Sequence, residues 1–178
     1  MKKMKFTLGA IIIAGLSLTS CSSDDNNDGG SNEVEIAGVY NLTEFNTEEP
    51  TDFNQDGTLN TNQTTESNCY SGSKITLNAD GSFRYQENRV LVDVVNGTSA
   101  CSSPSEYLGT WVNNGGVGTS AIISATYLDE NDTSRTLTLT KEGNKITDYR
   151  LLAQYPNRND AGGAVYSTGD VEIVYTKQ

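Results

Sequence analysis

The stretch "RTLTLT", residues 135–140, places a leucine at every second position and a threonine between them. Successive side chains of a β-strand point to opposite faces, so Leu137 and Leu139 would share a buried face while the threonines face water. This alternation is typical of a half-buried antiparallel strand. The stretch therefore predicts a fold built from strands with one face in a core.

The same period of two recurs along the chain. Ile75 and Leu77 are followed by the turn sequence "NADG" (78–81), after which Phe83 and Tyr85 resume the face, as in a β-hairpin with glycine at the turn. Other strands are predicted at 90–94, 107–112, 119–127, 145–152 and 171–175, with turns at 113–116 and 141–144. A single helical turn is expected in 58–70 or 153–168. The pattern predicts an all-β domain of eight or nine strands.

The N-terminus has the features of an export signal. Three lysines precede an apolar run, residues 6–18, that is shorter than the roughly 20 residues of a membrane-spanning helix. The sequence "LTSC" at 18–21 resembles the lipobox of bacterial lipoproteins, in which the signal is cut before the cysteine and the cysteine is acylated. We therefore predict a signal peptide at 1–20 and a lipid anchor on Cys21.

A polar, acidic segment follows the predicted anchor. Residues 21–33 contain glycines and carboxylates and no apolar cluster, so they are predicted to form a disordered tether. The Ser-Asp-Asp of residues 23–25 resembles the signals that direct lipoproteins of Bacteroidetes to the cell surface, although a plain spacer explains it equally well. We predict an outer-membrane protein that faces either the cell surface or the periplasm, and one domain at 34–178.

The net negative charge of the chain limits the kinds of molecule that it can bind. The whole chain has 12 Lys and Arg; without the three lysines of the signal it has 9, against 23 Asp and Glu, a net charge of -14. Such a surface repels phosphate, which excludes nucleic acid and electrostatic docking to anionic lipid. The acyl anchor on Cys21 is thus the expected link to the membrane, and we expect a monomer.

Two cysteines remain in the domain, Cys69 and Cys101. A pair of cysteines in an exported protein is most simply a disulfide. A loop of this length stabilises a fold by about 3.5 to 4 kcal/mol in the chain-entropy model. A reactive thiol is the alternative, but the chain has no histidine to generate a thiolate. We therefore interpret the two cysteines as a structural disulfide.

The sequence "DFNQDGTLNTNQ", residues 52–63, has the spacing of a calcium loop. Six of its residues fall at ligand positions: Asp52, Asn54, Asp56, Thr58 (through its carbonyl), Asn60 and Gln63. The last position normally holds a bidentate glutamate, and Gln63 offers one neutral oxygen; Glu66 would replace it only if the chain bends. A series of Asx-turns around Gly57 explains the loop as well. A structural Ca²⁺ site is one of two predictions.

Enzymatic chemistry has little support. Without histidine, catalytic triads, Cys-His pairs and the usual zinc sites are excluded. A hydrolase would need a carboxylate pair converging in a cleft, and Asp93, between two valines, is expected to face solvent. We predict that the protein is not an enzyme.

Several short motifs resemble the lipocalin-like lipoproteins of Bacteroidetes. They are Gly38-Val39-Tyr40, the "DFNQDG" insertion (52–57), a cysteine before "KITLNADGSFRY" (74–85), a second cysteine before "GTW" (109–111), and "VYTKQ" (174–178). The resemblance covers most of residues 36–178. It implies a closed up-and-down β-barrel of about eight strands, a size that holds one small ligand or is filled by its own side chains.

Four aromatic residues are candidates for the barrel interior: Tyr40, Phe83, Tyr85 and Trp111. They either line a ligand pocket or form the core. The first hypothesis is a lipid-anchored, non-enzymatic barrel that binds a small apolar or amphipathic ligand. The second is a structural or protein-interaction module with a filled barrel, working through the loops at 46–70 and 153–168.

Overall fold

The computed structural model describes residues 35–178; the predicted signal peptide, the anchor on Cys21 and the tether lie outside the described residues. Strands dominate these residues, and the two helices are single turns. The elements are β1 (Gly38–Thr51), β2 (Asn60–Asn62), α1 (Gln63–Glu66), η1 (Asn68–Tyr70), β3 (Lys74–Leu77), β4 (Ser82–Glu87), β5 (Val90–Asp93), β6 (Thr98–Cys101), β7 (Ser105–Val117), β8 (Ser120–Leu128), β9 (Ser134–Glu142), β10 (Lys145–Arg158) and β11 (Ala164–Lys177).

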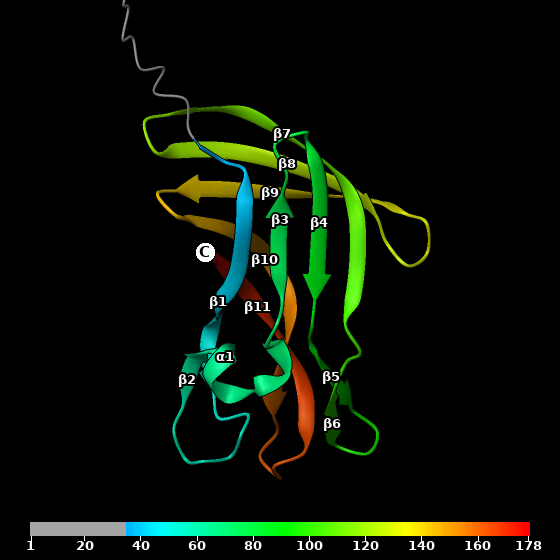
Figure 1. The fold of residues 1–178 in the computed structure, drawn as a ribbon. Coiled ribbons are helices and arrows are strands. Elements are labelled where there is room, and N and C mark those ends of the chain that lie inside the picture. Colours follow the sequence, from blue (N-terminus) through cyan, green and yellow to red (C-terminus); the bar gives the residue numbers. More distant parts are fainter. Residues whose placement is uncertain (1–34) are drawn as a thin grey trace, which may run out of the picture. The chain divides into compact units, whose positions relative to one another are not determined.

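Eight of the strands close into one antiparallel up-and-down barrel. β1, β3, β4, β7, β8, β9, β10 and β11 are neighbours in that order, and β11 pairs with β1 to complete the ring (Figure 1). Closure gives the first and last strands a partner, which removes the exposed edges of an open sheet. The predicted all-β barrel of about eight strands is confirmed.

Local sequence explains the individual strands. In β9, Leu139 is fully buried in the barrel while Thr136 and Thr138 are exposed, as the alternation predicts. The β3–β4 hairpin turns at Asn78–Gly81, where Gly81 has a φ of 83° that favours glycine. The expected helical turn is found in 58–70, as α1 and η1.

Three predictions of element bounds from the sequence are wrong. Residues 113–116 do not form a turn: they continue β7, and the chain reverses at 118–119. A β-bulge between Asn113 and Gly116 absorbs the irregular sequence, and β8 pairs on both sides of it. β10 and β11 likewise extend well beyond the predicted 145–152 and 171–175, because their far ends pair with each other.

One half of the barrel is filled by its own side chains. Tyr40, Ile75, Ile123, Leu139 and Ile146 come from five strands, and none has any exposed surface. The Tyr40 hydroxyl donates a hydrogen bond of 2.6 Å to the Ile36 carbonyl. We call this region, around these residues, the packed half.

The opposite end carries three longer segments, residues 52–73, 88–104 and 153–169, which we call the cap. They share a smaller apolar cluster of Phe53, Tyr70, Val90 and Ala164. Arg158 ties two of them together, because its Nε donates to the Phe53 carbonyl at 3.0 Å and its guanidinium lies 4.6 Å from the ring centre. The cap occupies the lower part of Figure 1.

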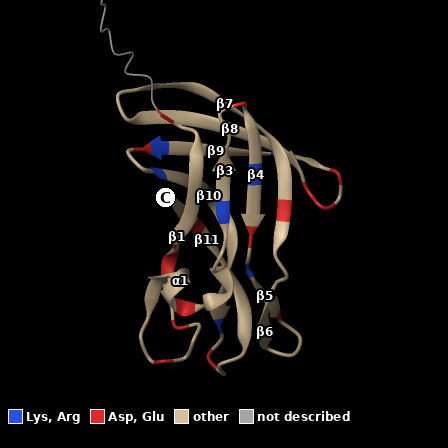
Figure 2. Cartoon of the chain, viewed as in Figure 1, with Lys and Arg blue, Asp and Glu red and all other residues tan. Residues whose placement is uncertain are grey.

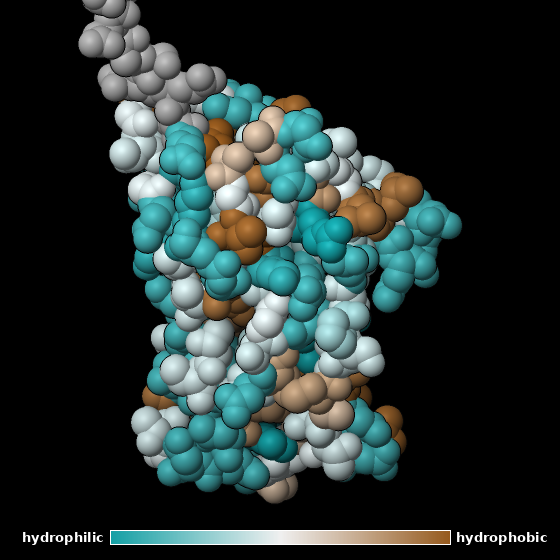
Figure 3. Space-filling model, viewed as in Figure 1, coloured by the Kyte–Doolittle hydropathy of each residue, from teal (hydrophilic) through white to brown (hydrophobic). Residues whose placement is uncertain are grey.

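Acidic residues gather in particular loops of the surface, whereas exposed apolar residues form separate patches. Figure 2 shows Asp and Glu concentrated in the loops of the cap and in the loop between β8 and β9. Figure 3 shows a mainly hydrophilic face with separate apolar patches. Isolated exposed apolar residues are normal on folded proteins and identify no site by themselves.

Candidate ligand-binding cavity

A cavity of about 340 Å³ lies where the barrel meets the cap. It is at the small end of the roughly 300–1,000 Å³ of typical ligand sites. We call the part of the barrel around it the cavity half. The lining residues come from β1, η1, β4, β5, β10, β11 and the connecting loops: Leu42, Phe45, Tyr70, Ser73, Tyr85, Glu87, Asn88, Arg89, Val90, Arg150, Gln154, Pro156, Tyr166, Ile173 and Tyr175.

The lining is amphipathic. Leu42, Phe45, Val90, Pro156 and Ile173 give it an apolar wall, to which the Tyr70 ring belongs as well, stacked on Phe45 with ring centres 5.1 Å apart. Charged and hydroxyl side chains supply the remainder. A site of this composition suits a molecule with one apolar and one polar end.

Arg150 and Asp148 form an ion pair in this half. Both Nε and Nη2 of Arg150 lie 2.7 Å from Asp148 Oδ2, and Asp148 is 5% exposed. Burial alone would lower the pKa of Arg150, but the Asp148 carboxylate, together with Tyr85 and Tyr175, raises that pKa above its ordinary value. Arg150 therefore carries a permanent charge next to the cavity.

A second polar chain runs along the end of β4. The Tyr85 hydroxyl donates to Glu87 Oε1 at 2.8 Å, and Arg89 Nη1 lies 3.3 Å from Glu87 Oε2. Burial, and then Tyr175 and Glu87, raise the pKa of Tyr85 well above its ordinary value. Tyr85 consequently stays neutral and keeps donating at any physiological pH.

A second recess, of about 270 Å³, lies on the other side of these groups. It shares Tyr85, Glu87, Arg89 and Arg150 with the first cavity and is otherwise lined by Tyr107, Tyr127, Asp129, Glu130, Arg135 and Leu137. The wall is incomplete on this side, because β10 pairs with β9 only from Lys145 to Asp148 and then continues with β11 alone. Arg150 comes directly after this separation.

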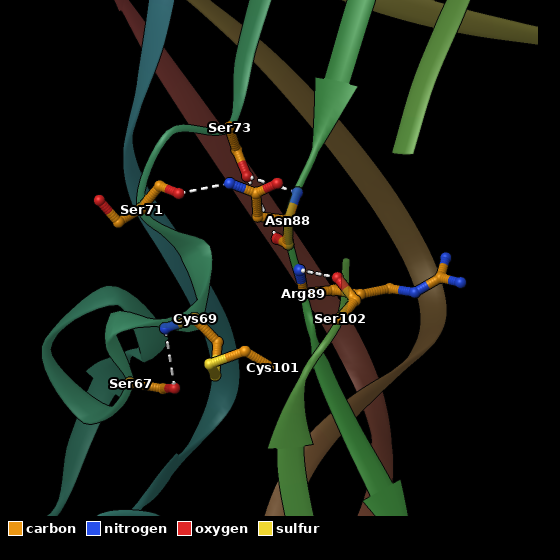
Figure 4. The surroundings of a disulfide bond; sticks show 8 residues. All are labelled: Ser67, Cys69, Ser71, Ser73, Asn88, Arg89, Cys101 and Ser102. Atoms are coloured by element: carbon orange, nitrogen blue, oxygen red, sulfur yellow. Dashed lines mark hydrogen bonds between the residues drawn. A yellow bond between two sulfur atoms is a disulfide. The ribbon is translucent and has the colours of Figure 1, made fainter. Parts of the chain in front are cut away.

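The disulfide fastens the cap beside the cavity. Cys69 in η1 is bonded to Cys101 in β6, with Cα atoms 4.9 Å apart, which confirms the predicted pair (Figure 4). Cys101 lies opposite Val90, and Tyr70 follows Cys69, so both neighbours line the cavity. The bond thus holds together two insertions that are far apart in sequence.

Serine hydroxyls reinforce the same junction (Figure 4). Ser73 Oγ accepts from the Asn88 amide at 2.9 Å and donates to the Asn88 carbonyl at 3.1 Å. Ser102 Oγ accepts from the Arg89 amide at 3.0 Å. These bonds position the start of β5, and with it Arg89 and Val90, against the cavity.

The four aromatic candidates belong to or pack against one apolar cluster, but they do not line the cavity together. Tyr40 and Phe83 are buried in the core, and Tyr85 alone among the four lines the cavity. Trp111 is half-buried against the core, and its Nε1 donates to the Asn78 carbonyl at 2.9 Å. The core interpretation thus accounts for the positions of Tyr40 and Phe83.

Sequence reasoning missed Arg150, Glu87 and Tyr175. A signal for Arg150 was present, because Ile146, Asp148 and Arg150 alternate on one face of β10, and two charges on an apolar face are unusual in a strand. Tyr175 shares its face with Val171 and Ile173 and resembled an ordinary core residue.

The loop at 52–58 is held by backbone amides that donate to its side chains. Asp52 accepts from the amides of Asp56 at 2.9 Å and Gly57 at 3.0 Å, and Asp56 Oδ1 accepts from Thr58 at 2.8 Å. The Thr58 amide, and then the Asn54 side chain, lower the pKa of Asp56. The Asx-turn interpretation describes these bonds directly.

The side chains at the later ligand positions of the loop, Asn60 and Gln63, make hydrogen bonds to different partners. Gln63 Nε2 donates to Thr51 Oγ1 at 2.8 Å, and Asn60 Oδ1 accepts from the Asn62 amide. Helix α1 instead brings Glu66 back, with Oε2 3.2 Å from the Asn54 amide. Within residues 35–178 no group of three His, Cys, Asp or Glu side chains is arranged to hold a metal ion. Calcium binding stays a prediction.

Comparison of the chain with protein-family models, curated proteins and solved structures found no match. Among the helices of residues 35–178, none is long and apolar enough to cross a membrane.

Proposed function

We propose that this protein is a lipid-anchored, non-enzymatic β-barrel lipoprotein of the outer membrane that binds a small amphipathic ligand. The observation that carries the proposal is the cavity of about 340 Å³ between barrel and cap, whose lining combines apolar side chains with Arg150, Tyr85 and Tyr175. A filled barrel needs no such space, and its interior avoids unneeded charges because burying them is costly.

The membrane part of the proposal is supported by the sequence. The apolar run at 6–18 and "LTSC" at 18–21 have the form of a lipoprotein signal. Acylation of Cys21 would place the barrel on the membrane without a spanning segment. Fractionation after labelling with a radioactive fatty acid tests this part: label in the membrane fraction that disappears in Cys21→Ala supports it, and unlabelled protein contradicts it.

The packed half favours one alternative, a structural or protein-interaction module. Its interior offers no space between Tyr40, Ile123 and Leu139. In that case the cap would be the working surface, and the cavity would hold only water.

Native mass spectrometry of the full chain, exported so that the disulfide forms, separates the two functions. Ligand binding predicts an added small mass that is lost in Leu42→Trp, because the indole fills the cavity. Val112→Trp is the matched control, since it adds the same ring to an exposed position on β7. A bare polypeptide for the parent protein would support the alternative.

A further inference from the structure

Arg150 has donor capacity that the protein itself does not use. Its Nε and Nη2 both point at one oxygen of Asp148, each at 2.7 Å. Among residues 35–178, Nη1 of Arg150 has no hydrogen-bond partner; the Tyr175 hydroxyl interacts with that of Tyr85, whose own proton is donated to Glu87. Arg150 and Tyr175 line the same cavity. A guanidinium carries five N–H donors in a planar fork that suits a carboxylate.

The free N–H donors of the lining, rather than its net charge, favour an anion, because Asp148 already balances the charge of Arg150. Arg89, Arg150 and Glu87 are its charged residues, and Glu87 is already engaged by Tyr85 and Arg89. A cationic head group would meet the guanidinium of Arg150, whereas a carboxylate would complete its hydrogen bonds. The carboxylates of the outer surface repel an anion in the cavity only weakly, because charges more than about 8 Å away are largely screened at physiological salt.

We infer that the ligand is an amphipathic carboxylate, such as a medium-chain fatty acid, whose head group binds Arg150 Nη1 and the Tyr175 hydroxyl. Its hydrocarbon chain lies against Leu42, Phe45 and Ile173. This inference rests on the proposed ligand-binding function and names the ligand class. The small volume limits the chain to medium length.

Calorimetric titration with three probes of equal chain length tests the head group. The full chain with Cys21→Ser, which carries no acyl group of its own, is titrated with decanoate, decanol and decyltrimethylammonium. We expect decanoate to bind at least about ten times more tightly than decanol, corresponding to about 1.4 kcal/mol. The cation is expected to give no measurable binding.

Two variants assign the effect to the cavity. Arg150→Lys keeps the charge beside Asp148 but loses the fork, and Tyr175→Phe removes only the hydroxyl. Each should weaken decanoate several-fold and leave decanol unchanged, and circular dichroism checks that both fold. Arg84→Lys is the matched control, because Arg84 pairs with Glu106 on the exposed face of β4.

The outcomes separate this inference from the function on which it rests. Equal affinity for decanoate and decanol, or full affinity in both variants, would overturn the carboxylate assignment while ligand binding stands. Failure of all three probes overturns the assignment too, and the added mass in the native spectrum of the parent protein then decides the function independently.

Discussion

The packed half and the cavity half share strands β1 and β10 but differ in what faces inward. Along β10, Ile146 has no exposed surface in the packed half, whereas Asp148 and Arg150 follow on the same face in the cavity half. The change coincides with the point at which β10 leaves β9. A strand paired on both sides supports a dry core, and where the pairing ends, charged side chains and open space take over.

The two halves are also stabilised differently. The packed half depends on apolar burial across the barrel, whereas the cavity half depends on the cap, which is fastened by Cys69–Cys101 and hydrogen bonds to serines. We therefore expect the packed half to determine whether the chain folds and the cavity half to determine what it binds.

Alkaline pH is expected to have the largest effect, complete unfolding. Burial raises the pKa of Tyr40 to about 12, and burial also raises the pKa of Tyr70 in the cap. A phenol whose pKa is higher in the folded state stabilises the fold fully below the unfolded value of 10.0, and this contribution is lost as the pH rises through the folded value. Exposed tyrosines such as Tyr149 can ionise in the folded protein, so we expect tyrosinate from the buried tyrosines as a later step above pH 10 that coincides with the loss of the circular dichroism signal. That later step preceding the loss would mean that the cap opens alone.

Truncation of the core should distinguish the two halves. Leu139→Ala removes a fully buried side chain and is expected to lower the free energy of unfolding by about 3 to 5 kcal/mol. Leu42→Ala makes the same chemical change at a half-buried position that already borders open space, so its cost should be clearly smaller. Guanidinium denaturation measures both, and equal costs would argue against the division.

Loss of the disulfide should lower the free energy of unfolding by about 3.5 to 4 kcal/mol, because the cross-link restricts a long loop of the unfolded chain. The double variant Cys69→Ser/Cys101→Ser in guanidinium denaturation measures this. Hydrogen exchange of the same variant locates the effect: faster exchange at Val90 and Tyr70 with unchanged Ile123 is expected. Uniform acceleration would show that the cap also supports the packed half.

Calcium should have the smallest effect. If the loop at 52–63 binds the ion, Ca²⁺ at ten times its dissociation constant raises the free energy of unfolding by about 1.4 kcal/mol. Asp56→Asn should abolish the rise. Thermal unfolding in Ca²⁺ against chelator measures it, with Asp93→Asn as a control at the exposed end of β5. No difference would leave the Asx-turns as the full account of the loop.

Much of the packed half was predictable from sequence alone. The alternation in 135–140 and the "NADG" turn correctly predicted β9 and the β3–β4 hairpin, because burial of one face requires a period of two. Pairing of Cys69 with Cys101 followed from their being the last two cysteines in a domain that the sequence predicts to be exported.

The cavity half was harder to predict because it depends on contacts between distant segments. Arg150 faces the cavity, but only the end of the β9–β10 ladder at Asp148 explains why space exists there. Tyr40 and Tyr85 have similar strand contexts in the sequence. Their different surroundings arise from the cap, whose segments meet only after folding.

Methyl-resolved NMR during a decanoate titration tests most directly whether one half of the barrel is a core and the other a binding site. We expect the signals of Leu42, Val90 and Ile173 to shift with a saturable curve, while those of Ile75, Ile123 and Leu139 stay in place. Saturable shifts in both sets, or in neither, would contradict the account.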